Sequence, residues 1–262
     1  VLVSESAIFA NGDPDEPILL TSIQESWGGI LISKSNDRSQ WKHLTVKNTT
    51  GIGKEINQRG LNRTGWFCTG GVTFYQSDVD LLGCSFVNSS AEDALNIISS
   101  DYSMLGCRFA SHASDAFDGD FVKGRISDSQ FVDIKGDAID FSGSEVEIEK
   151  IVVKNIFDKG ISAGEGTYLK IENSQFKKVG FGIVSKDSSN ISGNNLRIEN
   201  AAKSALAAYI KKENFGPAKI SSTNTTILNS ESIHLSQTKS SIKLNGLNLD
   251  STRFDSKSLY QD

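Results

Sequence analysis

The chain has little of what several common protein classes require. Among its 262 residues there are only 3 Pro, 1 Met, 3 Cys and 3 His. No run of 18 apolar residues is present, so the sequence predicts no membrane-spanning segment. Neither a zinc-ligand spacing of Cys and His nor a P-loop occurs. The three histidines are scattered along the chain, and none is assigned a role.

Charge is balanced rather than strongly of one sign. The chain carries 27 Lys and Arg against 32 Asp and Glu, a formal net charge of -5. Without a basic block, nucleic acid is not expected as a partner. The opening VLVSESAIFANGDPDEP lacks an initiator Met, a basic segment and an apolar signal segment. This is typical of a mature exported protein or of an excised fragment, so we expect an extracellular or cell-envelope location, and an upstream domain stays open.

A repeat of 22 residues organises most of the chain. Pairs of one small and one apolar residue recur at intervals of 22 or 23: Gly71-Val72, Ala94-Leu95, Ala116-Phe117, Ala138-Ile139, Gly160-Ile161, Gly182-Ile183 and Ala205-Leu206. A second apolar series keeps the same intervals: Phe86, Phe109, Phe131, Val153, Phe176 and Ile198. Two series with one period indicate a repeat architecture.

Each repeat consists of short strands and turns. Segments such as SQFVDIKGDAIDFSG place apolar side chains two positions apart, and no helix-length pattern of period 3.6 occurs. The leucine pattern of leucine-rich repeats is absent. We therefore predict an all-β fold, a single-stranded right-handed parallel β-helix of about ten coils of about 22 residues. One domain spans residues 1–262, with irregular coils in 1–70, a projecting loop at 51–67, regular coils in 71–217 and weaker coils in 218–262.

Several segments resemble a known group of proteins. NSQFKKVGFGIVSKDSS and DSQFVDIKGDAIDFSGS resemble the consensus coil of the right-handed parallel β-helix proteins of the pectate-lyase-like superfamily. WGGILI, EDALNI, SDAFDGDF and AAYIKKENFGPA are similar to the β-helix region of exported bacterial proteins, in which it accompanies spore-coat-kinase-like or lamin-tail modules. The resemblance covers about residues 16–218. It implies the fold, and this fold hosts lyases, hydrolases, epimerases and inert adhesins.

Stacking the coils aligns polar side chains in three columns. The first holds Asp93, Asp115, Asp137 and Lys159; the second holds Asn96, Asp118, Asp140 and Ser162; the third holds Asp120, Ser142, Gly164 and Lys186. The apolar neighbours Ile139 and Phe141 should point inward, so Asp118 and Asp140 should point outward.

Carboxylates stacked roughly 4.8 Å apart repel one another, so something should compensate for the repulsion. A bound cation such as Ca²⁺ is one candidate, and protonation of one carboxylate, which would mark a general acid, is another. Lysines are the third, since Lys159 ends the first column and Lys186 the third. A purely structural role also stays open, because Asp, Asn and Ser at turns hydrogen-bond the local backbone.

The resemblance implies roles for these residues. Polysaccharide lyases of this fold pair an acidic Ca²⁺ site with a Lys or Arg base that takes the proton alpha to a uronate carboxylate. On that pattern Asp118, Asp120 and Asp140 would hold the metal and Lys186 would be the base, with Asp118 and Asp140 in the catalytic group. The substrate-binding candidates are Asp115, Asp137, Lys159, Glu165, Tyr209 and Lys211, and Tyr209 would be a stacking platform for a sugar.

The favoured functional hypothesis is an extracellular carbohydrate-active module that binds or cleaves, in a lyase-like reaction, an acidic polysaccharide. A non-catalytic adhesion, spacer or envelope module is one alternative. A glycoside hydrolase is the other, because Asp118 with Asp140, or Asp115 with Asp137, could meet the carboxyl separation of about 5–9 Å that this chemistry uses.

Two cysteines fall in one apolar series. Cys84 and Cys107 each stand two residues before a ladder Phe, so both should face inward. Two buried thiols are favoured over a disulfide, which stays open.

Overall fold

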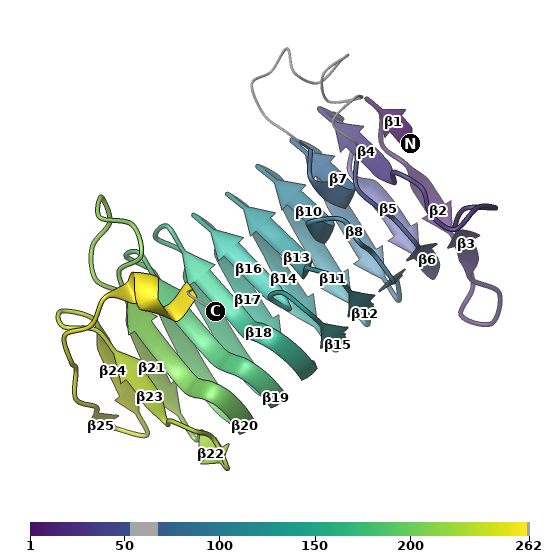
Figure 1. Ribbon diagram of the computed structural model, residues 1–262. Coiled ribbons are helices and arrows are strands. Elements are labelled where there is room, and N and C mark those ends of the chain that lie inside the picture. The colour runs from purple at the N-terminus through teal and green to yellow at the C-terminus, as the bar shows by residue number, and fades with distance from the viewer. Residues whose placement is uncertain (53–67, 261–262) are drawn as a thin grey trace.

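The computed structural model describes residues 1–52 and 68–260. Most of the predicted loop at 51–67 lies outside these residues. The chain winds into a parallel β-solenoid of about nine turns with about 23 residues per turn. Figure 1 shows the coils stacked in one row from the N-terminal to the C-terminal end. The predicted fold class is confirmed, and with it the architectural part of the resemblance.

Each coil contributes strands to three faces, here called A, B and C. Face A contains β1 (Leu2–Ser4), β4 (Ile30–Ser33), β7 (Gly70–Tyr75), β10 (Asp93–Ile98), β13 (Asp115–Asp120), β16 (Ile139–Ser142), the last parts of β18 (Val152–Gly164), β19 (Tyr168–Lys186) and β20 (Asn190–Tyr209), and β23 (His234–Ser236). Face B contains β2 (Phe9–Asn11), β5 (Ser39–Lys42), β8 (Val79–Leu82), β11 (Asp101–Leu105), β14 (Lys123–Ser127), β17 (Glu145–Glu149), the first parts of β19 and β20, β21 (Lys219–Thr223) and β24 (Ser241–Leu244). Face C contains β3 (Ile18–Leu20), β6 (Leu44–Lys47), β9 (Ser85–Val87), β12 (Arg108–His112), β15 (Gln130–Ile134), the first part of β18, the middle parts of β19 and β20, and β22 (Thr226–Leu228).

The C-terminal end departs from this pattern. β25 (Leu247–Asn248) folds back antiparallel on β24, with Lys243 opposite Asn248, and the 3-10 helix η2 (Ser256–Tyr260) follows. No helix among the described residues is long and apolar enough to cross a membrane.

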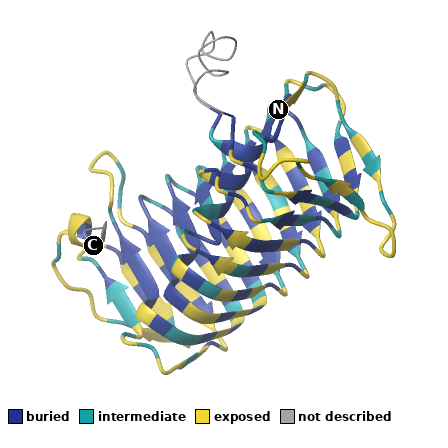
Figure 2. Cartoon of the chain, turned by 45° about the vertical axis from the view of Figure 1, so that its right-hand side comes forward, coloured by how far each residue is buried: buried dark blue, intermediate teal, exposed yellow. Residues whose placement is uncertain are grey.

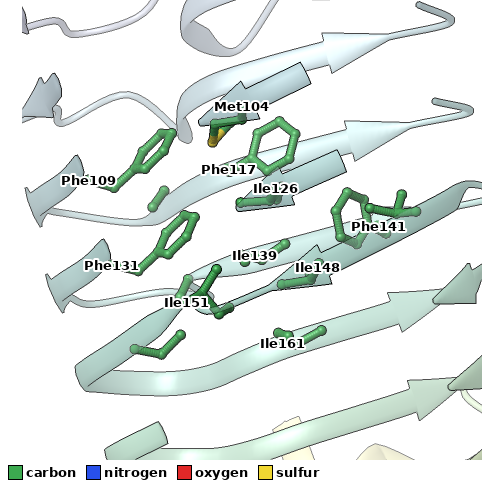
Figure 3. Packing of buried hydrophobic residues seen from close by; sticks show 14 of the residues in the cluster. Met104, Phe109, Phe117, Ile126, Phe131, Ile139, Phe141, Ile148, Ile151 and Ile161 are labelled. Carbon is green, nitrogen blue, oxygen red and sulfur yellow. The ribbon is translucent and has the colours of Figure 1, made fainter. Parts of the chain in front are cut away.

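The core consists of the two apolar ladders that the repeat predicted. Phe117 pairs with Ile139 in the next coil, and the rings of Phe86, Phe109 and Phe131 stack with centroids 4.8 Å apart. Figure 3 shows Phe109, Phe117, Phe131 and Ile139 among the side chains packed between the faces. Cys84 and Cys107 are buried and form no disulfide within the described part of the chain, so they pack here as thiols.

Face A differs from the other faces because its outer surface is also buried along much of its length. Strands β7 and β10 are buried at every position but the last, whereas β11 of face B alternates exposed and buried residues. Figure 2 shows this contrast as continuous dark blue beside stripes of blue and yellow. Near the N-terminal end, Leu31 packs with Ile52 and Cys68 on the outer surface. Near the C-terminal end, an apolar cluster is formed by Phe181, Val184, Ala207, Tyr209, Leu235, Phe254 and Leu259.

A ladder of left-handed residues forms the corner where face A passes into face B. One residue in each coil has a positive φ there: Gln76, Ser99, Phe121, Gly143 and Glu165, followed by Asp187. This conformation bends the chain between the two faces. It favours Gly or Asn, so the bulky Phe121 at φ 53° is unusual.

Candidate functional site on face A

The middle of face A carries the acidic columns on its outer surface, between the two apolar clusters. The register pairs Asp93 with Asp115, and Asp118 with Asn96 on one side and Asp140 on the other. Asp140 in turn pairs with Ser162, and Asp120 with Ser142. Because Phe117, Ile139 and Phe141 belong to the core, the acidic side chains between them point outward, as predicted. The three predicted columns are confirmed.

The first column ends in a buried ion pair. Lys159 Nζ lies 3.2 Å from Asp137 Oδ1 and 2.5 Å from Asp158 Oδ2, while the Lys159 backbone N–H donates to Asp137 Oδ1 at 2.9 Å. The Asp115 carboxylate accepts the backbone N–H of Asp137 at 2.7 Å. These contacts give Asp115 and Asp137 a structural role in addition to any functional one. This agrees with the structural alternative that the sequence left open for Asp residues at turns.

Burial shifts the pKa of several of these carboxyl groups upward. Desolvation and the charge of Asp115 raise the pKa of Asp93 to about 8. Desolvation raises the pKa of Asp115 to about 6, against the hydrogen bond from Asp137. In Asp137, desolvation raises the pKa well above its ordinary value, and Lys159 opposes this shift.

Asp118 lies at the centre of the acidic group. Asn96 Nδ2 donates to Asp118 Oδ2 at 3.0 Å. Desolvation, followed by the charges of Asp93, Asp120 and Asp140, raises the pKa of Asp118 well above its ordinary value. The pKa of Asp120 is raised by desolvation and by Asp140. Its surroundings therefore favour the neutral form of Asp118.

Asp140 has a different environment. Its Oδ1 atom lies 3.7 Å from the ammonium of Lys186, so its negative charge has a partner of opposite sign. The same oxygen has no hydrogen-bond partner among the described residues. Nor has the buried Oγ of Ser162, the next residue in the column. Two adjacent buried polar atoms thus have unused hydrogen-bonding capacity beneath the outer surface of face A.

The predicted metal ligands are only partly brought together. Among the described residues, the carboxylates that place oxygens within 4.8 Å of one another are Asp115, Asp137 and Asp140. Asp118 and Asp120, predicted as ligands with Asp140, are not in this group. Lys159 already places an ammonium against Asp137, and Lys186 places one near Asp140. The calcium site therefore stays a prediction.

The remaining predicted residues lie around the C-terminal end of the acidic group. Glu165 forms an ion pair with Lys212. Burial raises the pKa of Glu165, but the hydrogen bonds from Lys212 and Ser142 outweigh burial and leave it below its ordinary value. The backbone N–H groups of Lys211 and Lys212 both donate to Asp187 Oδ1, at 2.7 and 2.8 Å.

Tyr209 is not placed as a stacking platform. Its ring is only 1% exposed and packs edge-on against Phe254, with centroids 6.4 Å apart. It belongs to the apolar cluster that covers the C-terminal end of face A.

Two exposed aromatic residues at the edges of face A were not predicted. Phe121 is 65% exposed at the corner into face B, and Phe157 is 71% exposed at the corner from face C. The ring of Phe121 lies over Gly143, where an added Cβ would come within 2.7 Å of it. The sequence signal for Phe121 was an aromatic residue directly after Asp120, because the other coils have small or polar residues at this corner. Ser162 was also missed; its Gly-x-Ser-x-Gly sequence lies inside β18 and not at a strand-to-helix turn.

Comparison with known proteins adds little to this description. No family model and no curated protein matches the chain. Among solved structures, the catalytic domain of a GH87 alpha-1,3-glucanase in complex with nigerose is 13% identical, with a TM-score of 0.40, over 97% of this chain and 62% of that chain. The tailspike protein 3 of bacteriophage CBA120 is 11% identical, with a TM-score of 0.27, over 93% of this chain and 54% of that chain. The chain thus spans less than two thirds of either protein, and the chemistry of face A has to be inferred from its own residues.

Proposed function

We propose that face A binds a polysaccharide and cleaves a glycosidic bond with Asp118 as the acid and Asp140 as the nucleophile. The observation that carries this proposal is the contrast between two register-paired carboxyl groups. Burial raises the pKa of Asp118 and so favours its protonated form, whereas Asp140 Oδ1 lies 3.7 Å from the Lys186 ammonium. Neighbouring groups whose environments push their protonation apart are the usual arrangement for acid and base roles.

The spacing supports a particular course of reaction. Asp118 and Asp140 are one strand apart, roughly 4.8 Å between backbones, which favours the short carboxyl separation of retaining glycosidases. Asp118 gives its proton to the glycosidic oxygen as the bond from that oxygen to the anomeric carbon breaks, and Asp140 forms an ester with this carbon. A water molecule then attacks the same carbon, its proton passes to the Asp118 carboxylate, and the bond to Asp140 breaks.

The surroundings of the pair fit a carbohydrate. The exposed rings of Phe121 and Phe157 offer two apolar faces at opposite edges of the site. Phe121 adopts a left-handed φ that is costly for a bulky residue, and such strain is typical of functional positions.

A lyase acting on a uronic-acid polymer is the second candidate, and Lys211 supports it. Partial desolvation and the charges of Lys186 and Lys159 lower the pKa of Lys211, which makes it a better base than an ordinary lysine. This reaction would need a cation to neutralise the uronate carboxylate, as the predicted calcium site would. A non-catalytic adhesion or spacer role is the outcome if neither reaction occurs.

The test is a panel of neutral glucans and uronic-acid polymers, incubated with wild type, Asp118→Asn and Asp140→Asn. A hydrolase releases new reducing ends, and each substitution is expected to lower kcat by at least about 100-fold. A lyase instead yields unsaturated products and loses activity with a calcium chelator. Asp101→Asn, an exposed carboxylate at the start of β11 on face B, is the matched control and should keep full activity.

Two further measurements separate the roles. Phe121→Ala keeps the acid pair, so it should raise KM more than it lowers kcat. If the wild-type protein cleaves no polymer in the panel, and a thermal unfolding transition shows that it is folded, the adhesion or spacer role is favoured instead.

A further inference from the structure

A second groove, with a volume of about 800 Å³, lies on the outer surface of face B. Its walls come from β14, β17, β19, β20, β21, β24 and β25. Its C-terminal end is closed by the turn from β24 into β25, which brings Asn248 beside Lys243. None of the residues assigned to the site on face A lines it.

The register arranges the groove's side chains as a regular grid. The first column runs Tyr168, Asn190, Lys219 and Ser241, and the second runs Lys170, Ser192, Ser221 and Lys243. Successive members are roughly 4.8 Å apart. Tyr168 is 63% exposed, so its ring offers an aromatic face at one end of a row of amide and hydroxyl groups.

The charge along this groove changes from one end to the other. At the N-terminal end the charges are of both signs: Lys123 Nζ lies 3.2 Å from Glu145, Lys170 Nζ lies 3.2 Å from Glu172, and Glu147 adds a further carboxylate. Beyond β17, no carboxylate is found among the described lining residues. Lys219 and Lys243 form no ion pair within the described part of the chain, so two positive charges stand unneutralised among polar neutral groups.

We propose that the face B groove binds an anionic polysaccharide of the uronic-acid type without cleaving it. The two spaced ammonium groups match a polymer with separated carboxylates, and the Asn and Ser side chains match its hydroxyl groups. Tyr168 provides a stacking face for one sugar ring. Nucleic acid fits less well, because its dense phosphates call for more than two cations and the chain's net charge is -5.

The role proposed for this groove is to hold a polymer and not to react with it. The inference is independent of the function proposed for face A. A polymer anchored on face B would keep the chain on its target surface whichever chemistry face A performs.

The experiment is a binding titration with polygalacturonate at low and at physiological salt. Lys219→Glu/Lys243→Glu is expected to weaken binding by at least about tenfold at low salt, because two attractive contacts become repulsive. The matched control is Lys47→Glu/Lys154→Glu on face C, which makes the same change in net charge at exposed lysines and should bind like wild type. Tyr168→Ala should weaken binding without changing its salt dependence.

The inference is wrong if the wild-type protein binds no polygalacturonate at low salt. It is also wrong if the face C control variant loses as much affinity as the face B variant. Tighter binding of polyglutamate or of an oligonucleotide than of the polysaccharide would contradict the proposed ligand class. Loss of polygalacturonate binding in Asp118→Asn/Asp140→Asn, with the face B variant unaffected, would place the polymer on face A. That last result would refute the face B inference and leave the proposed function standing.

Discussion

Faces A and B are wound from the same coils, but they treat stacked charges in opposite ways. On face B, opposite charges meet between coils: Lys123 pairs with Glu145 at 3.2 Å, and Arg125 contacts Glu149 at 2.6 Å. On face A, Asp118 stacks directly on Asp140. In these pairs face B places opposite charges against each other, although Glu149 also stacks on Glu172. The middle of face A stacks carboxyl groups in adjacent coils.

This difference separates coil positions whose stacked side chains favour the stability of the fold from positions whose stacked side chains oppose it. Exposed ion pairs contribute about 0–1 kcal/mol each, so the pairs on face B mainly prevent a penalty. Face A tolerates like charges in a partly buried place, helped by Lys159, Lys186 and retained protons. A local departure from an otherwise consistent pattern is expected at a functional site.

The largest expected effect of a substitution on stability is from Lys159→Met on face A. It leaves Asp137 and Asp158 without the buried ammonium that contacts both of them, and removing one partner of a buried pair costs about 3–5 kcal/mol. We expect a clear fall in the melting temperature. The double variant Lys159→Met/Asp137→Asn should recover part of it, and unchanged stability in the single variant would contradict the role assigned to Lys159.

The pH dependence of stability should come from face A. The pKa of Asp93 is raised to about 8 and that of Asp115 to about 6, above the usual value of about 3.9 in the unfolded chain. The stabilisation of the folded state that comes from protonating these two groups is therefore fully present below pH about 4. It is lost as the pH rises through 6 for Asp115 and then through 8 for Asp93. Stability should fall by on the order of 5 kcal/mol between pH 5 and pH 9, because each unit of pKa shift corresponds to about 1.4 kcal/mol.

Thermal unfolding across this pH range is the measurement. Asp93→Asn should flatten the slope, whereas Glu147→Gln, an exposed residue on face B, should leave it unchanged. A stability that rises with pH would show that these carboxyl groups are not buried as described.

The smallest effect is expected from Lys123→Met on face B. This lysine contacts the Glu145 carboxylate at 3.2 Å, the same distance as between Lys159 and Asp137, but the side chains of Lys123 and Glu145 are both 70% exposed. Solvent and salt screen the pair, so the loss should be within about 1 kcal/mol by chemical denaturation. A loss as large as that of Lys159→Met would remove the contrast between the two faces.

Sequence reasoning predicted the fold and the columns because both depend on one number. An interval of 22 residues fixes which side chains stack, and period 2 fixes which of them point outward. For that reason the alignment of Asp118 with Asp140 was correct without any knowledge of side-chain contacts.

What depended on side-chain conformation or on distant segments could not be predicted in the same way. Tyr209 was expected in a sugar site, but Phe254, 45 positions later, covers it. The grouping of Asp115 with Asp137 and Asp140 depends on how side chains turn at the corner into face A, which spacing does not specify.

The two apolar clusters at the ends of face A also limit the length of the polar surface between them. Among the described residues, the rows from Asp93 to Lys159 lie between these clusters, and three coil spacings amount to roughly 14 Å. A polymer lying along the solenoid axis would therefore contact face A over a short oligosaccharide only. Product length would then be set by the number of uncovered coils, and adding or deleting one coil in this stretch would change it by a fixed step.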